Sequence, residues 1–103
     1  MSINKQKKTR VGHNSPMMVR IGEFLGRKKE TLWTIHEAGT LLGLLPAESE
    51  VEAMERYYLA DIPDDPVTRK RRDFRRHDLP TLLNNWTGEL DKARLWELET
   101  KRS

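Results

Sequence analysis

A dense block of cations offers the clearest chemistry in this sequence. Six of the eight positions from 69 to 76 are Lys or Arg, and Arg outnumbers Lys five to one. The planar guanidinium suits bidentate contacts with phosphate or carboxylate groups. Such crowded charges repel one another, and an anionic partner relieves that repulsion. The block therefore predicts a surface for a polyanion, and nucleic acid is the leading candidate because binding would release counterions from its phosphates.

We predict phosphate contacts from this block and from cations near the N-terminus. Residues 1–14 are polar and basic without hydrophobic periodicity, which is typical of a flexible arm. Such an arm can order on a nucleic acid, although a solvated terminus that binds nothing is the alternative. The predicted contact residues are Lys5, Lys7, Lys8, Arg10, Arg69, Lys70, Arg71, Arg72, Arg75 and Arg76. DNA is favoured over RNA, and no base-specific readout is indicated.

Charge is segregated along the chain, although the formal net charge is only +3. Residues 1–31 carry eight Lys or Arg against two acids, residues 32–66 one against eight, and residues 67–103 ten against six. Either the acidic middle pairs with the basic flanks inside the fold, or separate surfaces meet separate partners. In the second case, a protein partner or a second copy of the chain would contact Glu48, Glu50, Glu52 and Glu55. A protein–protein adaptor or inhibitor is thus the alternative function.

Residues that could catalyse a reaction are few and scattered. The three histidines, at positions 13, 36 and 77, lie far apart in the sequence. No metal-ligand spacing, nucleophile motif or phosphate-binding glycine loop occurs. Glu89 and Asp91 lie at the start of an expected helix, where the helix dipole alone favours acids. We therefore expect a non-catalytic protein with no metal, no cofactor and no small-molecule substrate.

Composition indicates one small domain. Of 103 residues, 36% are apolar and 34% are charged, so a few aromatic side chains must supply much of the buried area. The lack of cysteine excludes disulfides and thiolate metal sites. No apolar run approaches the roughly 20 residues of a membrane span, and the first residues lack the apolar region of a secretory signal. We expect a soluble cytoplasmic protein with a flexible basic arm over residues 1–14 and a single helical domain over residues 15–103.

Local patterns in the first half of the chain predict three helices. Ser15 before a proline favours a helix start, and Gly26 ends that helix. Thr34 and Glu37 have the spacing of a capping box for a second helix, which reaches residue 44. The same pattern at Ser49 opens a third helix, which reaches residue 59. The predicted second and third helices together resemble a helix–turn–helix in outline. The third helix, which would take the place of the recognition helix, is acidic and would repel phosphates, so we expect an ordinary helical hairpin.

The cationic block is predicted to form a fourth helix. Asp65 can cap it, and Val67 and Phe74 would share its apolar face. Pro80 disfavours a continuous helix, so we expect a break near residues 77–78.

Beyond the break, Asp78 should cap a short helix that ends at residues 84–85, and a turn at Thr87 and Gly88 should precede a final helix from about residue 90. Helical spacing places four residues on the inner face of the short helix: Leu79, Leu82, Leu83 and Trp86. No alternating strand pattern occurs. The predicted fold is therefore all-α, a small bundle of about five short helices.

A family resemblance lies within residues 79–86. The spacing Leu79-x-x-x-Leu83-x-x-Trp86 is similar to the Tyr-x-x-x-Ile-x-x-Trp motif of DnaD-like domains, with Leu in place of Tyr. Those domains occur in primosomal proteins and phage replisome organisers. The surrounding segment, RRDFRRHDLPTLLNNWTGELDKAR, also looks like parts of phage or bacterial replication proteins. The resemblance implies a helical domain that binds DNA and helps to bring a replicative helicase to an origin, with Leu83 and Trp86 as scaffold residues.

Overall fold

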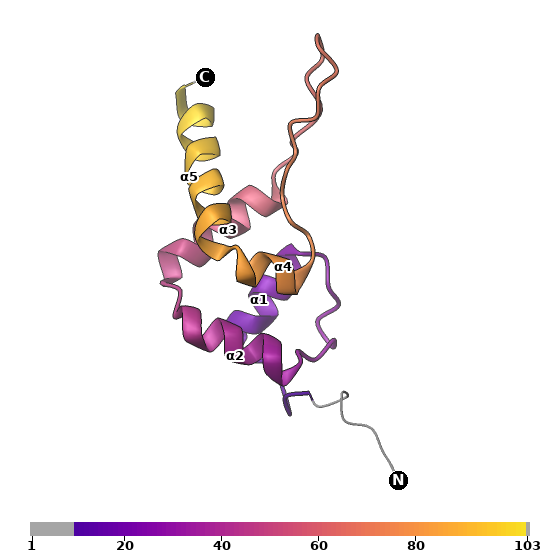
Figure 1. Ribbon diagram of the computed structural model, residues 1–103, viewed down its shortest axis with the longest axis vertical. Coiled ribbons are helices and arrows are strands. Elements are labelled where there is room, and N and C mark those ends of the chain that lie inside the picture. Colours follow the sequence, from indigo (N-terminus) through magenta and orange to yellow (C-terminus); the bar gives the residue numbers. More distant parts are fainter. Residues whose placement is uncertain (1–9, 103) are drawn as a thin grey trace.

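The computed structural model describes residues 10–102, and five α-helices make up 58% of that part of the chain. They are α1 (Pro16–Phe24), α2 (Ile35–Leu44), α3 (Glu48–Leu59), α4 (Leu79–Asn84) and α5 (Trp86–Arg102) (Figure 1). The described residues contain no strand, only an isolated bridge between Arg10 and Thr34. The prediction of a small all-α bundle is confirmed.

Three helices begin where the sequence predicts. The Ser15 hydroxyl accepts a backbone N–H of the first turn of α1 at 3.3 Å. At α2, the Glu37 N–H donates to the Thr34 hydroxyl at 3.0 Å, and the Thr34 N–H donates to the Glu37 carboxylate at 2.9 Å. Asp78 caps α4 by accepting the N–H of Thr81 at 3.2 Å. These side chains satisfy amides that have no partner inside the helix.

The predicted start of α3 at Ser49 is wrong. The N-cap is Ala47, and α3 begins at the next residue. The Ala47 N–H donates to the Glu50 carboxylate at 3.1 Å, so half of a capping box forms without a hydroxyl. Leu45 turns the chain out of α2 in the left-handed region, at φ 46°. Because the connection between α2 and α3 is short, α3 starts earlier than the capping pattern at Ser49 predicts, at Glu48.

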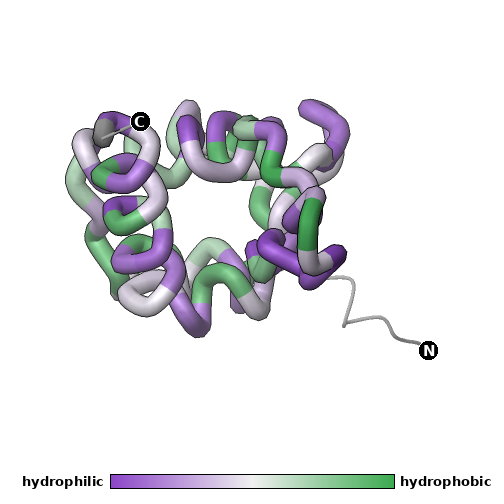
Figure 2. The backbone as a smooth tube through the Cα atoms, turned by 90° about the horizontal axis from the view of Figure 1, so that it is seen from above, coloured by the Kyte–Doolittle hydropathy of each residue, from purple (hydrophilic) through white to green (hydrophobic). Residues whose placement is uncertain are grey.

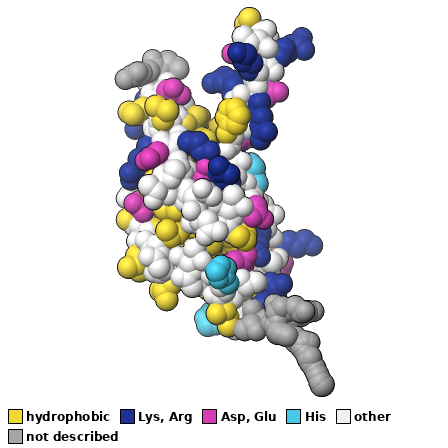
Figure 3. All heavy atoms as spheres, viewed as in Figure 1, with side chains coloured by type: hydrophobic (Ala, Val, Ile, Leu, Met, Phe, Trp, Pro, Cys, Tyr) yellow, Lys and Arg dark blue, Asp and Glu magenta, His cyan; other side chains and the backbone are white. Residues whose placement is uncertain are grey.

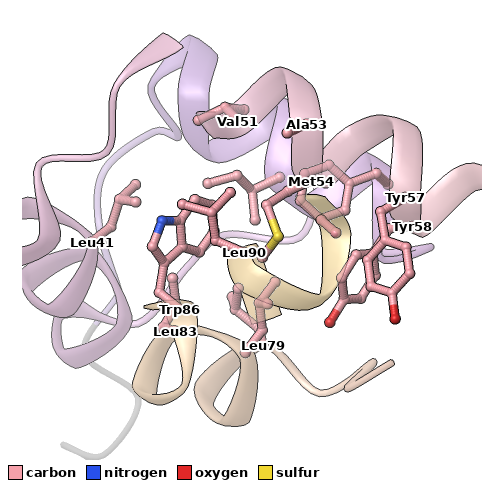
Figure 4. Packing of buried hydrophobic residues seen from close by; sticks show 14 of the residues in the cluster. Leu41, Val51, Ala53, Met54, Tyr57, Tyr58, Leu79, Leu83, Trp86 and Leu90 are labelled. Atoms are coloured by element: carbon pink, nitrogen blue, oxygen red, sulfur yellow. The ribbon is translucent and has the colours of Figure 1, made fainter. Parts of the chain in front are cut away.

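A single hydrophobic core joins the helices. α3 packs along α5, α1 packs against α3, and α2 packs against α4. Seen from above, the helices follow one another around a central space (Figure 2), which buried side chains fill (Figure 4). The stripe predicted at helical spacing lies in this core, each member at most 4% exposed: Leu79, Leu82, Leu83 and Trp86. Trp33, immediately before α2, is only 1% exposed.

The predicted fourth helix is absent. Residues 61–78 instead form an irregular segment, here called the hairpin loop, which leaves α3, projects from the helical body and returns to α4 (Figure 1). At its tip, one carboxylate oxygen of Asp65 accepts the N–H groups of Val67 at 2.8 Å and Thr68 at 2.9 Å. The Asp65 N–H then donates to the Lys70 carbonyl at 2.9 Å and closes the turn. Asp65 therefore begins a turn and not a helix.

Charge repulsion and a missing apolar face explain why no helix forms there. Cations four positions apart, such as Arg71 and Arg75, would face each other on a helix and repel. The apolar face would have consisted of Val67 and Phe74, which are 86% and 57% exposed here. Arg69 has φ 63°, a left-handed conformation that a helix does not contain. Without a face to bury, helix propensity alone is too weak to order this segment as a helix.

The junction of α4 and α5 also differs from the expectation. Only Asn85 interrupts the two helices, and its N–H donates to the Thr81 carbonyl at 3.1 Å. The predicted turn at Thr87 and Gly88 is wrong, because both residues lie in the first turns of α5. This early start places Trp86 and Leu90 on one buried face. Core burial thus outweighs the helix-breaking tendency of the glycine.

The first described residues belong to the helical domain. The Val11 N–H donates to the Trp33 carbonyl at 3.0 Å. Asn14 donates to the Thr31 carbonyl at 2.8 Å and accepts the Trp33 N–H at 3.1 Å. Residues 11 and 14, which the sequence analysis assigns to the arm, therefore contact the segment before α2. Among residues 10–102, no helix combines the length and the apolar character that crossing a bilayer requires.

Truncation of Trp86 is expected to destabilise the fold strongly. The side chain is 4% exposed, so Trp86→Ala should lower the free energy of unfolding by roughly 3–5 kcal/mol, because it leaves a cavity. Urea denaturation followed by circular dichroism measures this. Trp86→Phe should cost less, since it keeps most of the packing and removes an indole N–H that has no hydrogen-bond partner. As a control, Leu98→Ala on the exposed face of α5 should change stability by less than about 0.5 kcal/mol. Equal stability of Trp86→Ala and the wild type would contradict the core described here.

Candidate nucleic-acid interface

Four consecutive cations occupy the outer part of the hairpin loop. Arg69, Lys70, Arg71 and Arg72 are all exposed, and none forms a salt bridge with a carboxylate of the described residues. Figure 3 shows Lys and Arg side chains along the projecting loop. The Arg71 guanidinium donates to the Asp73 carbonyl at 2.7 Å, which leaves its remaining N–H groups free for other acceptors. The loop therefore presents an open positive surface.

Arg75 is used inside the fold. Its side chain is 7% exposed and pairs with both oxygens of Asp73, each at 2.8 Å. Its guanidinium also donates to three carbonyls at the C-terminal end of α3, those of Tyr57 (2.8 Å), Tyr58 (3.2 Å) and Ala60 (2.7 Å). The Tyr57 carbonyl also accepts the N–H of Ala60 at 3.3 Å, so Arg75 adds a second donor there. Carbonyls in the last turn of a helix lack the partners that interior carbonyls have. Arg75, one of the predicted phosphate contacts, is therefore engaged within the fold as a cap of α3.

The Arg75 guanidinium also fixes the protonation state of its partner. Its hydrogen bonds hold the pKa of the Asp73 carboxyl well below the usual range, and burial opposes them only in part. Asp73 in turn raises the pKa of Arg75, against a smaller effect of burial. Both groups are charged at neutral pH, so the ion pair is intact there.

Arg76 lies at the base of the loop beside a buried carboxylate. Its side chain is half exposed, and its Nε lies 3.6 Å from a Glu89 oxygen. Glu89 is 1% exposed. It accepts the Tyr58 hydroxyl at 2.6 Å, and the Lys92 ammonium lies 2.5 Å away. Burial and the hydrogen bond to Glu89 raise the pKa of the Tyr58 phenol, which therefore stays a donor.

The burial of Glu89 is not predicted by its place at a helix start, where the helix dipole alone favours an acid. It lies at the second position of the series Trp86, Glu89, Leu90 and Ala93, whose spacing defines one face of α5. This spacing is the sequence feature that could have predicted the burial of Glu89. Lys92 also joins α5 to the loop, since its ammonium donates to the Phe74 carbonyl at 2.8 Å.

The N-terminal cations do not join the loop cations. Arg10 donates to the Leu32 carbonyl at 2.8 Å, shortly before α2. The beginning of the described chain (indigo) lies at the end of the molecule opposite the tip of the loop (Figure 1). The structure therefore separates Arg10 from the cationic block. The remaining predicted contacts of the arm lie outside the described residues: Lys5, Lys7 and Lys8.

The predicted acidic partner surface is largely occupied within the fold. Arg20 on α1 donates to Glu48 at 2.6 Å and to Glu55 at 2.9 Å, which ties α1 to α3. Glu50 accepts the N–H that starts α3, so it acts as a cap. Glu52 is exposed and forms no salt bridge with the described residues. Part of the acidic middle thus pairs with a basic flank, but with α1 and not with the loop.

A cleft separates the hairpin loop from the C-terminal half of α5 (Figure 3). Its volume is about 340 Å³. The lining combines cations with aromatic and aliphatic side chains and one carboxylate: Tyr57, Ile62, Arg71, Arg72, Phe74, Lys92, Leu95, Trp96 and Glu99. The Arg71 guanidinium lies over the Phe74 ring, 5.5 Å from its centroid. Phe74 and Trp96 were not among the predicted site residues.

No catalytic or metal-binding group is assembled in the described part of the chain. Residues 10–102 contain no cluster of three His, Asp or Glu side chains that could hold a metal ion. His77 packs its ring against Tyr58, with 5.5 Å between the centroids. The non-catalytic interpretation stays a prediction.

Comparisons with protein-family models, with curated proteins and with solved structures found no match for this chain. The resemblance to DnaD-like domains therefore stays a prediction.

Acid stability should depend on Asp73. Because its folded pKa lies below the unfolded value of about 3.9, its contribution is full above that value and disappears as the pH falls through the folded pKa. The lowered pKa values of Glu55 and Asp65 act in the same direction. Asp73→Asn should therefore lose less stability than the wild type between pH 6 and acidic pH values below about 3.9, measured by urea denaturation. Asp64→Asn, an exposed position on the same loop, is the control. Identical acid profiles of Asp73→Asn and the wild type would contradict the ion pair.

Proposed function

We propose that this protein binds nucleic acid, with DNA favoured over RNA, by placing the outer cations of the hairpin loop on the phosphate backbone. The observation that supports this most is the run of four exposed cations, residues 69–72, on a loop that projects from the body and lacks salt bridges within the described residues. Arg76, half exposed at the base of the loop, adds a fifth charge. Arg75 takes no part in this contact because its guanidinium is buried.

Electrostatics favour a polyanion as the partner. Neighbouring cations on an exposed loop repel one another, and phosphates would relieve that repulsion while releasing counterions. Arginine can grip a phosphate with two parallel hydrogen bonds. The loop is two chain segments wide, and the major groove of B-DNA, about 12 Å wide, admits a two-stranded ribbon. The expected contact reads the backbone and carries no base sequence by itself.

The base of the loop is held firmly enough to present these charges. Arg75 fastens the returning segment to α3, and Lys92 fastens it to α5. A preordered loop loses less conformational freedom on binding than an unstructured one. The proposal includes a cytoplasmic location, and the family resemblance adds a role in a replication or phage-regulatory assembly.

A second candidate function, a protein–protein adaptor, is favoured by one observation. An apolar groove of about 440 Å³ lies between α1 and α2. Its rim includes Leu42 and Leu45, which are 72% and 77% exposed. Exposed apolar surface of this kind marks many protein interaction sites. Binding there would depend little on salt, whereas phosphate binding depends on it steeply.

Neutralising the outer cations should abolish retention of nucleic acid. In a mobility-shift assay, the variant with Gln at positions 69–72 should bind single- and double-stranded DNA and RNA far more weakly than the wild type. The slope of log affinity against log salt should fall by about 0.9 for each lost phosphate contact with duplex DNA. The four positions are exposed, so helical circular dichroism should be unchanged.

A control of equal net charge separates the loop from a general charge effect. Four exposed cations elsewhere offer it, replaced together by Gln: Lys28, Lys29, Arg94 and Lys101. This variant should keep most of the wild-type affinity and salt slope. Equal losses in the two variants, or full retention by the loop variant, would contradict the proposed interface.

A further inference from the structure

The cleft between the hairpin loop and α5 holds chemistry that phosphate binding alone does not need. Phosphates require cations, yet this cleft also carries two aromatic rings, Phe74 on the loop and Trp96 on α5. Phe74 is a large apolar residue, yet it is 57% exposed. Lys92 binds the backbone carbonyl of Phe74 at 2.8 Å, which ties this part of the loop to α5. The ring is therefore accessible at a tethered position of the loop.

The exposed ring forms a flat platform together with a guanidinium. Arg71 stacks over Phe74 at 5.5 Å from the ring centroid. On the opposite wall, Trp96 packs against Tyr57, with 5.7 Å between the centroids, and stays partly exposed. Nucleobases stack on aromatic faces and on guanidinium planes, and this stacking tolerates any base. Arg71 and Arg72, two of the cations that would hold the phosphates, line the same cleft as these rings.

In a duplex, the faces of the bases are covered by their neighbours, so only an unpaired strand can place a base face on such a platform. A groove that combines cations for the backbone with aromatic rings for the bases is the arrangement that single-strand binders use. We propose that the cleft binds single-stranded nucleic acid, with a base stacked at Phe74 and Trp96 and the adjoining phosphates on Arg71 and Arg72. This inference rests on the proposed function and specifies which form of nucleic acid the site takes.

An acidic amphipathic helix is the other ligand whose charge suits this lining. A helix docks through apolar anchors at i, i+3, i+4 and i+7, which need a long apolar groove. The cleft has a volume of only about 340 Å³, near the lower end of small-ligand sites, which span about 300–1,000 Å³. Such a space suits one or two bases better than a series of helix anchors. The single strand is therefore the favoured occupant.

Intrinsic fluorescence gives a direct test in the full chain. Trp33 and Trp86 are 1% and 4% exposed in the core, while Trp96 lines the cleft, so a ligand there should quench Trp96 selectively. The probe is an oligo-dT strand of about 10 nucleotides, within the roughly 4–16 nucleotides that a small single-strand-binding fold covers. Titration should quench the emission of the wild type and leave that of Trp96→Phe almost unchanged, although that variant still binds in a mobility-shift assay.

Matched substitutions test the platform itself. Phe74→Ala should weaken oligo-dT binding by about 5- to 150-fold, the range expected for losing one stacked base. Phe74→Tyr should retain the affinity, because it keeps the ring. Leu98→Ala is the control: Leu98 is also 57% exposed, and it does not line the cleft. Duplex binding should be insensitive to all three substitutions.

The outcomes separate this inference from the proposed function. Salt-dependent binding of oligo-dT and duplex without quenching, and with full affinity in Phe74→Ala, would overturn the cleft inference and leave the phosphate-binding loop intact. Failure of every nucleic acid to bind at low salt would overturn both. Quenching by an acidic amphipathic peptide but not by oligo-dT would also overturn the inference and assign the cleft to a protein partner.

Discussion

The Arg75 guanidinium is the contact on which the arrangement of the hairpin loop depends. An α-helix ends with carbonyls that have no partner inside it, and α3 ends where the chain must leave the core. Arg75, on the returning segment of the loop, donates to the three carbonyls of Tyr57, Tyr58 and Ala60 at this end, while Asp73 neutralises its charge. One side chain thus closes the base of the loop and completes α3. Without it, the returning segment of the loop would lose its hydrogen bonds to the end of α3.

A buried carboxylate forms the second anchor. Burying Glu89 is costly unless its oxygens are paired and hydrogen-bonded. Tyr58 from α3, Lys92 from α5 and the backbone N–H of Arg76 together meet that requirement. These groups come from α3, from α5 and from the loop, so the Glu89 carboxylate links the loop to both helices. The base of the loop is therefore rigid, and its tip, with residues 69–72, is held only by a turn.

Local signals in the sequence predicted the features that depend on neighbouring residues alone. The caps at Ser15, Thr34 and Asp78 and the buried stripe of α4 need only side chains a few positions apart, and the structure contains them. The prediction of a helix through the cationic block was wrong, because the hairpin loop that forms there depends on contacts with the end of α3, which is distant in the sequence. Nothing near Arg75 in the sequence indicates that the end of α3, some 15 to 18 positions earlier, would accept its hydrogen bonds.

The same limit applies to the candidate site, because charge density identified the cationic segment but could not assign individual cations. Residue type alone does not distinguish Arg20 and Arg75 from the exposed cations of the loop. In the structure, however, both form ion pairs with carboxylates of the fold. What distinguishes residues 69–72 is their geometry. They lie beyond the last anchor of the loop, where the described fold supplies no carboxylate to pair with them. No salt bridge within the described residues relieves their mutual repulsion, and that remaining electrostatic cost, rather than the number of cations, favours an external polyanion as the partner.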